Sequence, residues 1–115
     1  MPDFADVCRR ADVYITDNSS TLFEFAATGR PVVVLNAPEF RRNVNHGLRF
    51  WEAATVGVQV DHPRDLVAAV ASALEDPEPS QNAREAALAI VYTYRSGGAS
   101  RAAAALSDWA APVVA

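Results

Sequence analysis

The sequence predicts an α/β fold in which a short parallel sheet is flanked by helices. Three apolar runs, at residues 13–15, 32–35 and 56–60, are separated by longer segments whose apolar residues recur at helical spacing. Strands that alternate with helices form parallel sheets, with the connecting helices packed on the faces. Three strands are few for this architecture, and 115 residues suffice for one domain only. The chain therefore corresponds to half of a doubly wound domain.

The first half of the chain is predicted to begin with a helix over Asp3–Ala11 and a strand over Val13–Ile15. A second helix, Thr21–Thr28, follows a polar turn. Gly29 ends this helix, because glycine reaches the left-handed conformation of a helix C-terminus without steric cost. Pro31 then excludes any continuation of the helix.

The second half is predicted to contain two strands and three helices. Val32–Leu35 consists of four apolar residues without alternation, which is typical of a strand covered on both faces. A polar loop at 36–45 and a helical turn at 47–54 precede the third strand, at 56–60. The three helices are expected at Pro63–Leu74, Ala83–Tyr94 and Ser100–Trp109.

Two apolar rows on these helices are expected to lie in the core. Leu66, Val70 and Leu74 recur at four-residue intervals on the first helix, and Leu106 and Trp109 are three residues apart on the last. The prediction therefore includes a carboxy-terminal helix that packs against the rest of the domain.

The turn between the first strand and the second helix is the main candidate binding site. Asp17, Ser19, Ser20 and Thr21 follow a strand at the end where open α/β sheets bind ligands. Hydroxyls, together with the amides expected to be unpaired at a helix start, suit a diphosphate. Glu24 follows one turn later, where its carboxylate suits a pair of sugar hydroxyls. The alternative is structural, because these residues are common helix caps and Thr21 and Glu24 have capping-box spacing.

A basic segment after the second strand is the other candidate. Arg41, Arg42, His46 and Arg49 bring three permanent cations and one titratable ring to the ligand-binding end of the sheet, where arginine suits phosphate. The alternative is a solvated loop held to the core by the aromatic residues Phe40, Phe50 and Trp51. Nothing in the sequence pairs His46 with a catalytic partner, so the catalytic residues are not assigned.

Composition excludes several classes of function. The net charge is −4 and the basic residues, all arginine, form no cluster larger than a pair, which argues against a nucleic-acid partner. One cysteine and two separated histidines provide no metal-ligand spacing, and no cofactor motif is present. No apolar run approaches the roughly 20 residues of a membrane span, and the first residues do not resemble a signal peptide. We expect a cytoplasmic protein, with peripheral association at the inner face of the membrane as an option.

The stretch from Thr16 to Val32 resembles a motif of the CDP-glycerol glycerophosphotransferases, which build teichoic-acid-like and capsular polymers. It reads TDNSSTLFEFAATGRPV, and the family motif is T-D-x-S-S-x-x-F-D/E followed by G-K/R-P-V/I. More broadly, the stretch is similar to the nucleotide-sugar half of GT-B glycosyltransferases and to UDP-N-acetylglucosamine 2-epimerases. Asn18 stands where the family usually has an aromatic residue, and Glu24 where aspartate is commoner. A second stretch, SGGASR at 96–101, resembles D-G-x-A/S-S/T-x-R but is one residue shorter.

This resemblance implies a partial Rossmann-like fold of the GT-B C-terminal type with three layers, in which residues 1–115 form one donor-nucleotide-binding half-domain. It also implies a nucleotide-activated donor, either CDP-glycerol or a UDP-sugar, and transfer of glycerol phosphate or a sugar to a cell-envelope polymer. The implied donor contacts are Ser19, Ser20 and Thr21 for the diphosphate and Glu24 for the ribose or another hydroxyl. Arg41 and Arg42 are further candidates for contact with phosphate.

Two other functions stay open at this point. A UDP-sugar epimerase or another glycosyltransferase would use the same half-domain, and a non-catalytic module would bind the nucleotide without turnover. The family's upstream strands and acceptor domain have no counterpart in this sequence, so the strand Val13–Ile15 is expected to expose an unpaired edge. Such an edge recruits another chain, either a second copy or a partner that supplies the missing half.

Overall fold

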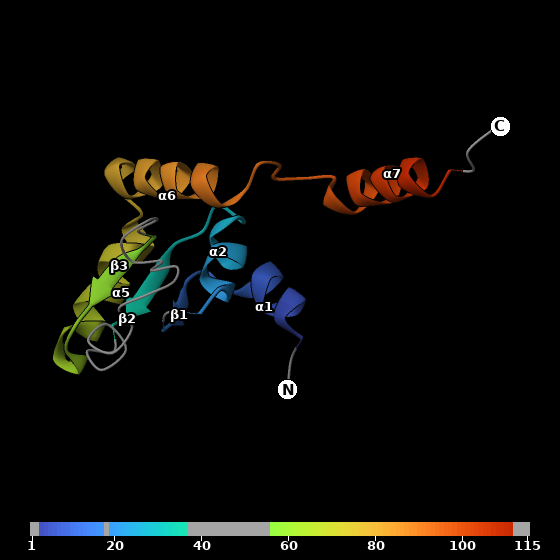
Figure 1. Ribbon diagram of the computed structural model, residues 1–115. Helices are drawn as coiled ribbons and strands as arrows, with labels where there is room; N and C mark the ends of the chain where they lie inside the picture. The colour runs from blue at the N-terminus through green and yellow to red at the C-terminus, as the bar shows by residue number, and fades with distance from the viewer. Residues whose placement is uncertain (1–2, 18, 37–55, 112–115) are drawn as a thin grey trace, which may run out of the picture.

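The structure is a computed structural model that describes residues 3–17, 19–36 and 56–111 (Figure 1). The helices and strands follow one another in the predicted order. They are α1 (Phe4–Arg10), β1 (Tyr14–Thr16), α2 (Thr21–Ala26), β2 (Val32–Leu35), β3 (Val58–Val60), the 3-10 turn η1 (Pro63–Asp65), α5 (Leu66–Glu75), α6 (Glu78–Val91) and α7 (Gly98–Ala110).

The described strands form one parallel sheet in the order β1-β2-β3. Tyr14 is paired with Val32, and Val33 with Val58, so β2 is the central strand. The predicted α/β class and parallel sheet are therefore confirmed. All three strands end at one edge of the sheet, and the turn to α2 leaves from that edge.

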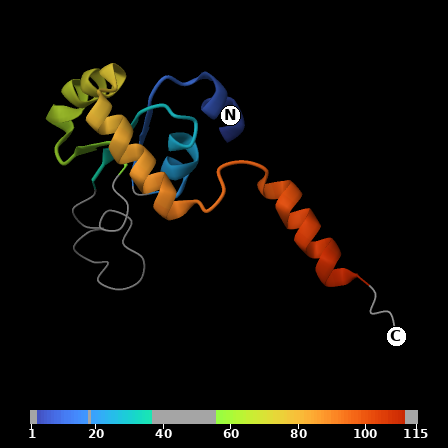
Figure 2. The same ribbon diagram turned by 90° about the horizontal axis from the view of Figure 1, so that it is seen from above.

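Helices cover both faces of the sheet, as the three-layer prediction requires. Val32 and Val34 face a core shared with α2 and α6, whereas Val33 faces a second core shared with α5. This division follows from the period of two residues in a strand, and it explains why β2 has no polar position. Seen from above, α6 runs diagonally in front of the sheet, with α5 on one side of it and α2 on the other (Figure 2).

Helix α6 begins at Glu78, five residues before the predicted start at Ala83. Pro77 is the N-cap residue and Pro79 lies in the first turn, where a missing N–H costs nothing because no helical carbonyl would accept it. The prolines of the segment 76–80 therefore belong to the start of the helix and do not precede it.

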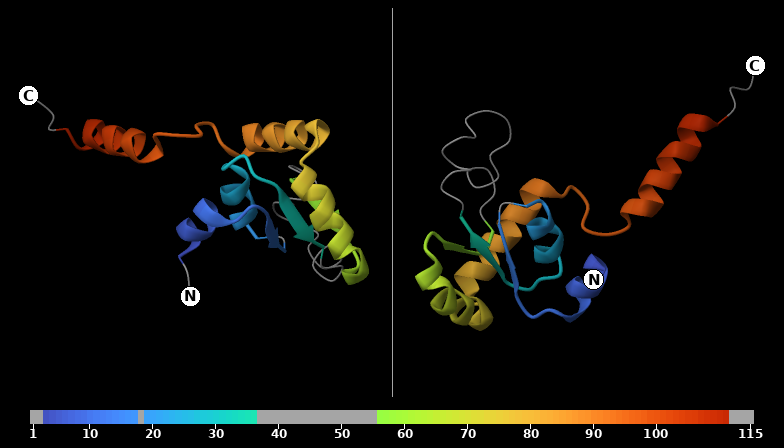
Figure 3. Two further views of the ribbon diagram at one scale, coloured as in Figure 1. Left: turned by 180° about the vertical axis from the view of Figure 1, so that it is seen from behind. Right: turned by 90° about the horizontal axis from the view of Figure 1, so that it is seen from below.

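Helix α7 forms as predicted but does not join the core. Leu106 is 64% exposed and Trp109 is 85% exposed, so the prediction that both are core residues is wrong. Every view shows α7 standing away from the sheet beyond an extended connection (Figures 1, 2 and 3). None of its residues is buried against the described part of the chain.

The predicted apolar row on α5 is only partly correct. Leu66 and Val70 pack against the core, but Leu74 is 55% exposed. Each step of four residues advances about 40° around a helix, so a row of three such residues drifts off the buried face. Ala69 and Ala73 occupy that face, and their small side chains let α5 approach the sheet closely.

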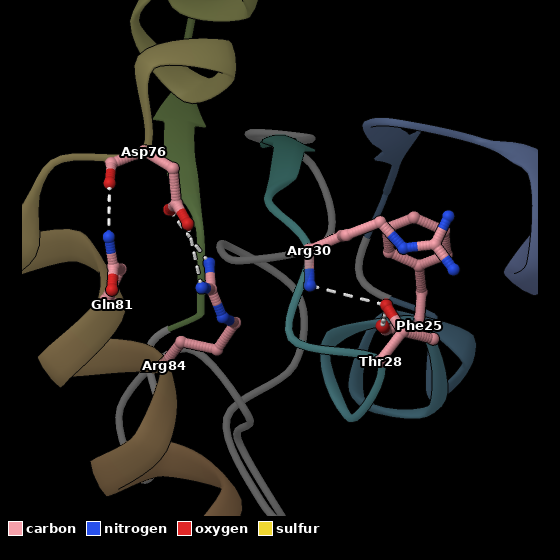
Figure 4. A network of polar contacts seen from close by, with 6 residues as sticks. All are labelled: Phe25, Thr28, Arg30, Asp76, Gln81 and Arg84. Atoms are coloured by element: carbon pink, nitrogen blue, oxygen red, sulfur yellow. Dashed lines mark hydrogen bonds and ion pairs between the residues drawn. The ribbon is translucent and has the colours of Figure 1, made fainter.

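Arg30 fastens the β1–α2–β2 unit to α1. Its guanidinium donates hydrogen bonds to the carbonyls of Ala11 and Cys8 at the end of α1. The guanidinium also lies 5.6 Å from the centroid of the Phe25 ring (Figure 4). Gly29, just before it, has the predicted left-handed conformation, with φ +83°, but α2 ends earlier than predicted, at Ala26, and its C-cap Ala27 is right-handed.

A buried ion pair joins α5 to α6. Arg84, which is 7% exposed, donates from Nη1 and Nη2 to the two carboxylate oxygens of Asp76 at 3.0 and 2.9 Å (Figure 4). Gln81 donates to the Asp76 carbonyl at 2.7 Å. Asp76 itself adopts the left-handed conformation, with φ 43°, so these contacts hold a strained corner in place.

The predicted loop at 36–45 lies outside the described residues except for Asn36, and the predicted turn at 47–54 lies wholly outside them. Asn36 ends β2 at the edge where ligands are expected, and its side-chain amide donates to Asp61 Oδ1 at 2.9 Å. Among the described helices, none has the length and apolarity that crossing a membrane would require.

Candidate functional site

The turn from β1 to α2 brings Ser19, Ser20 and Thr21 together at the carboxyl edge of the sheet. The Thr21 hydroxyl donates to Ser19 Oγ at 3.0 Å and lies 3.0 Å from the hydroxyl of Tyr14. Because Thr21 has only one proton to give, Tyr14 donates in that second contact. The three hydroxyls thus form a chain that leads from the core to Ser19, while Ser20 is exposed beside it.

The capping box predicted for Thr21 and Glu24 is wrong. Thr21 is the first helical residue rather than the cap, and the N-cap residue Ser20 makes no side-chain capping bond. The amides of Leu22 and Phe23 bond to the carbonyls of Ser19 and Ser20 at 3.2 and 3.1 Å. These amides are therefore not free for a ligand, and the turn offers hydroxyls more than backbone N–H groups.

Glu24 lies one turn into α2, on the exposed side of the helix. It borders a hollow of about 310 Å³ between α2 and the connection from α6 to α7. Its other lining residues come from the end of α2 and from that connection: Ala27, Tyr92, Tyr94, Arg95, Ser96 and Gly98. The site therefore joins the two stretches that resemble family motifs, which are about 70 residues apart in the sequence.

Arg95 is held in place on the wall of this hollow, which we call the α2/α6–α7 hollow. Its Nη1 donates to Glu85 Oε2 at 2.8 Å, and its Nη2 donates to the carbonyl of Ala27 at 3.4 Å. Burial raises the pKa of Tyr92, the nearby Glu24 carboxylate raises it further, and Arg95 opposes both effects. Tyr92 is therefore a neutral phenol at physiological pH.

Arg101 stiffens the second motif stretch from the start of α7. Its guanidinium lies 4.0 Å from the centroid of the Tyr94 ring and donates to the carbonyl of Ser96. Gly97, between them, has φ +71° and allows the chain to turn into α7. The shortened SGGASR stretch thus forms an ordered corner beside Glu24.

Sequence reasoning missed Tyr92 and Glu85. Tyr92 follows the end of α6, and its amide bonds to the Leu88 carbonyl, so in the sequence it resembles the last apolar residue of a helix. Glu85 reaches Arg95 across ten residues and the end of a helix. No motif spacing signals either contact.

Several predicted site residues are not tested by the described part of the chain. Arg41, Arg42, His46 and Arg49 all lie outside it. Asp17 is described and exposed after β1. Within the described ranges, no three His, Cys, Asp or Glu side chains gather closely enough to hold a metal ion.

A family model for CDP-glycerol:poly(glycerophosphate) glycerophosphotransferase matches residues 1–105. The chain belongs to this family. The match covers both elements of the site, the turn at Ser19–Thr21 and the connection that carries Arg95. The predicted family resemblance is therefore confirmed. No curated protein and no solved structure matches this glycerophosphotransferase-family chain.

Proposed function

We propose that this chain forms the donor-binding half-domain of a glycerophosphotransferase and binds CDP-glycerol for transfer to a cell-envelope polymer. Family membership supports the donor class. The observation that carries the proposal is that both motif stretches meet along α2, with the hydroxyl-rich turn at its start and the α2/α6–α7 hollow at Glu24. A GT-B architecture and a cytoplasmic location are part of the same proposal.

In this proposal Ser19 and Ser20 donate to the diphosphate. Thr21 positions Ser19 through the hydroxyl chain that starts at Tyr14. Transfer breaks the bond between the bridging oxygen and the phosphorus that carries glycerol, as an acceptor hydroxyl attacks that phosphorus and CMP departs. Donors aimed at the diphosphate oxygens offset the charge that develops there. The base that takes the acceptor proton stays unassigned.

Glu24 accepts from a hydroxyl pair of the donor, with the ribose as the first candidate. Its carboxylate is exposed and makes no ion pair with another described residue, so it is available to a ligand. Arg41 and Arg42 lie outside the described residues. They are proposed as additional phosphate contacts because in the sequence they follow β2, whose carboxyl end lies at the same edge of the sheet as the turn at Ser19 and Ser20.

The test is calorimetric titration of the full chain with CDP-glycerol, CDP, UDP and UDP-N-acetylglucosamine. We expect CDP-glycerol to bind best, and Ser20→Ala and Glu24→Ala each to weaken it roughly tenfold, as for the loss of a hydrogen bond to or from a charged group. Ser107→Ala, on the exposed α7, is the matched control and should bind as the wild type does.

The outcomes separate the rival functions. Stronger binding of UDP-N-acetylglucosamine would favour a sugar-nucleotide enzyme, an interpretation that Glu24 in place of aspartate also favours. Binding of CDP-glycerol without release of CMP in the presence of acceptor would indicate a binding module. Affinities that do not change in Ser20→Ala or Glu24→Ala would overturn the proposed site.

A further inference from the structure

The α2/α6–α7 hollow has the wrong charge for a diphosphate. Its described walls carry one carboxylate, Glu24, and one guanidinium, Arg95, and the positive charge of Arg95 is already paired with Glu85. A dianion placed there would meet an uncompensated Glu24 carboxylate and gain no free cation. Like charges at close range oppose binding, so the hollow suits an uncharged, hydrogen-bonding group.

The hollow has the side chains that an uncharged planar ligand needs. Tyr92 and Tyr94 present aromatic rings, and stacking of bases on aromatic rings is a common source of affinity for nucleobases. Arg101 contacts the Tyr94 ring and limits its movement. A volume of about 310 Å³ lies at the small end of the range for ligand pockets, which begins at about 300 Å³.

Arg95 adds hydrogen-bond donors to the wall of the hollow. A guanidinium has five N–H donors, and the contacts to Glu85 and Ala27 use one on each terminal nitrogen. The remaining donors favour a base edge with two adjacent acceptors. Cytosine has such an edge, at O2 and N3, whereas uracil carries a proton on N3 and presents a donor at that position.

We infer that the α2/α6–α7 hollow binds the nucleoside of the donor, with Tyr92 as a stacking surface for the base and Arg95 as the specificity-determining residue that favours cytidine. This inference rests on the proposed function, because it assigns the second part of the same donor. The diphosphate then lies toward Ser19 and Ser20, and Glu24 accepts from the ribose hydroxyls between the two parts.

The test separates the two parts of the donor by titrating cytidine, uridine and pyrophosphate into the full chain, followed by NMR. We expect Arg95→Gln to weaken cytidine roughly tenfold, since it removes a charged donor, and Tyr92→Leu to weaken it by a similar factor, since it removes a stacking ring. Pyrophosphate should bind both variants as it binds the wild type. Arg64→Gln, an exposed arginine on η1, is the matched control, and thermal melting checks that each variant is folded.

Several results would overturn the inference. The first two concern the Arg95→Gln variant: its affinity for cytidine is unchanged, or its affinities for cytidine and for pyrophosphate fall equally. The other two concern the wild type: it binds cytidine no better than uridine, or it does not bind cytidine at millimolar concentration. If CDP-glycerol still requires Ser20 in such a case, the proposed function stands without this nucleoside site. If cytidine requires Arg95 but CDP-glycerol binds no better than cytidine, the nucleoside site stands and the proposed function fails.

Discussion

At the scale of single residues, Arg84 shows how a charge is kept inside this domain. Both terminal nitrogens are paired with Asp76, while Nε is buried and without a partner among the described residues. The pair joins the end of α5 to α6. It also stabilises the corner between them, where Asp76 has the left-handed conformation. Its removal should therefore loosen the packing of α6 on the sheet.

We expect Arg84→Met to lower the free energy of unfolding by about 2 to 3 kcal/mol. Loss of one partner from a buried pair costs about 3 to 5 kcal/mol, and the Asp76 carboxylate, which is 23% exposed, keeps part of its hydration. Denaturant unfolding measures the change. Arg64→Met, at an exposed position, is the control and should change stability by less than about 0.5 kcal/mol. Equal effects of the two substitutions would show that the ion pair contributes nothing.

Among the glycines that the structure describes, Gly57 is the one that the fold requires most strictly. Its φ is +79°, and a Cβ at this position would lie 2.2 Å from the carbonyl oxygen of Val32 in the central strand. Gly29 has a similar φ of +83°, but a Cβ added there would have nothing within 4 Å. The two positions therefore separate backbone strain from steric clash.

We expect Gly57→Ala to destabilise the domain by about 3 kcal/mol or more, because β2 and the chain entering β3 must move apart. Gly29→Ala should cost only about 1 to 2 kcal/mol, the cost of the left-handed conformation alone. Thermal unfolding of both variants checks the order. A larger loss in Gly29→Ala would contradict the close approach at Gly57.

At the scale of elements, α7 differs from the long helices α5 and α6 because it buries nothing against the described part of the chain. Its apolar residues recur at the same helical spacing as those of a core helix, yet no described strand or helix covers them. Leu88 on α6 is the opposite case, with 0% exposure. Helical periodicity predicted both helices, but it did not distinguish a helix that packs from one that stands away.

We expect the double substitution Leu106→Ser and Trp109→Ser to change the free energy of unfolding by less than about 0.5 kcal/mol. Leu88→Ala should cost about 2 to 5 kcal/mol, since it leaves a cavity in a packed core. Urea unfolding followed by circular dichroism measures both. A loss above about 1 kcal/mol in the double variant, on the order of a core contact, would mean that α7 packs on the domain in solution.

At the scale of the whole molecule, β1, like β3, is an edge strand of the described sheet. It pairs with β2 on one side, and no described strand lies on the other. Ile15, at the centre of β1, is 42% exposed. An apolar edge strand with unpaired backbone groups is a template for pairing with another chain.

We expect the chain to self-associate at high concentration, and Ile15→Lys to reduce this association, because a charge on an edge strand opposes pairing. Light scattering across a concentration series measures the mass. Val67→Lys, on an 82% exposed position of α5, is the matched control and should leave association unchanged. A monomeric wild type at the highest concentration would contradict the prediction.

Sequence reasoning predicted the fold more closely than it predicted the site. The strands and the parallel order followed from local patterns, such as the apolar run of β2 and the glycine after α2. The turn residues Ser19 and Ser20 were identified, but their bonding was not, because the start of α2 depends on the Tyr14 hydroxyl from a neighbouring strand. The predicted start of α6 was wrong, because prolines can either start or break a helix and here they start it.

The sequence by itself determined the α/β class, the order of the elements, the family and the hydroxyl-rich turn, because each depends on residues close together in the chain. Only the tertiary structure decided that Glu24, Tyr92 and Arg95 share one hollow, that Arg84 is buried, and that α7 is not. These features depend on which elements meet in space. Contacts across about 70 residues are set by packing on the sheet, which local periodicity does not encode.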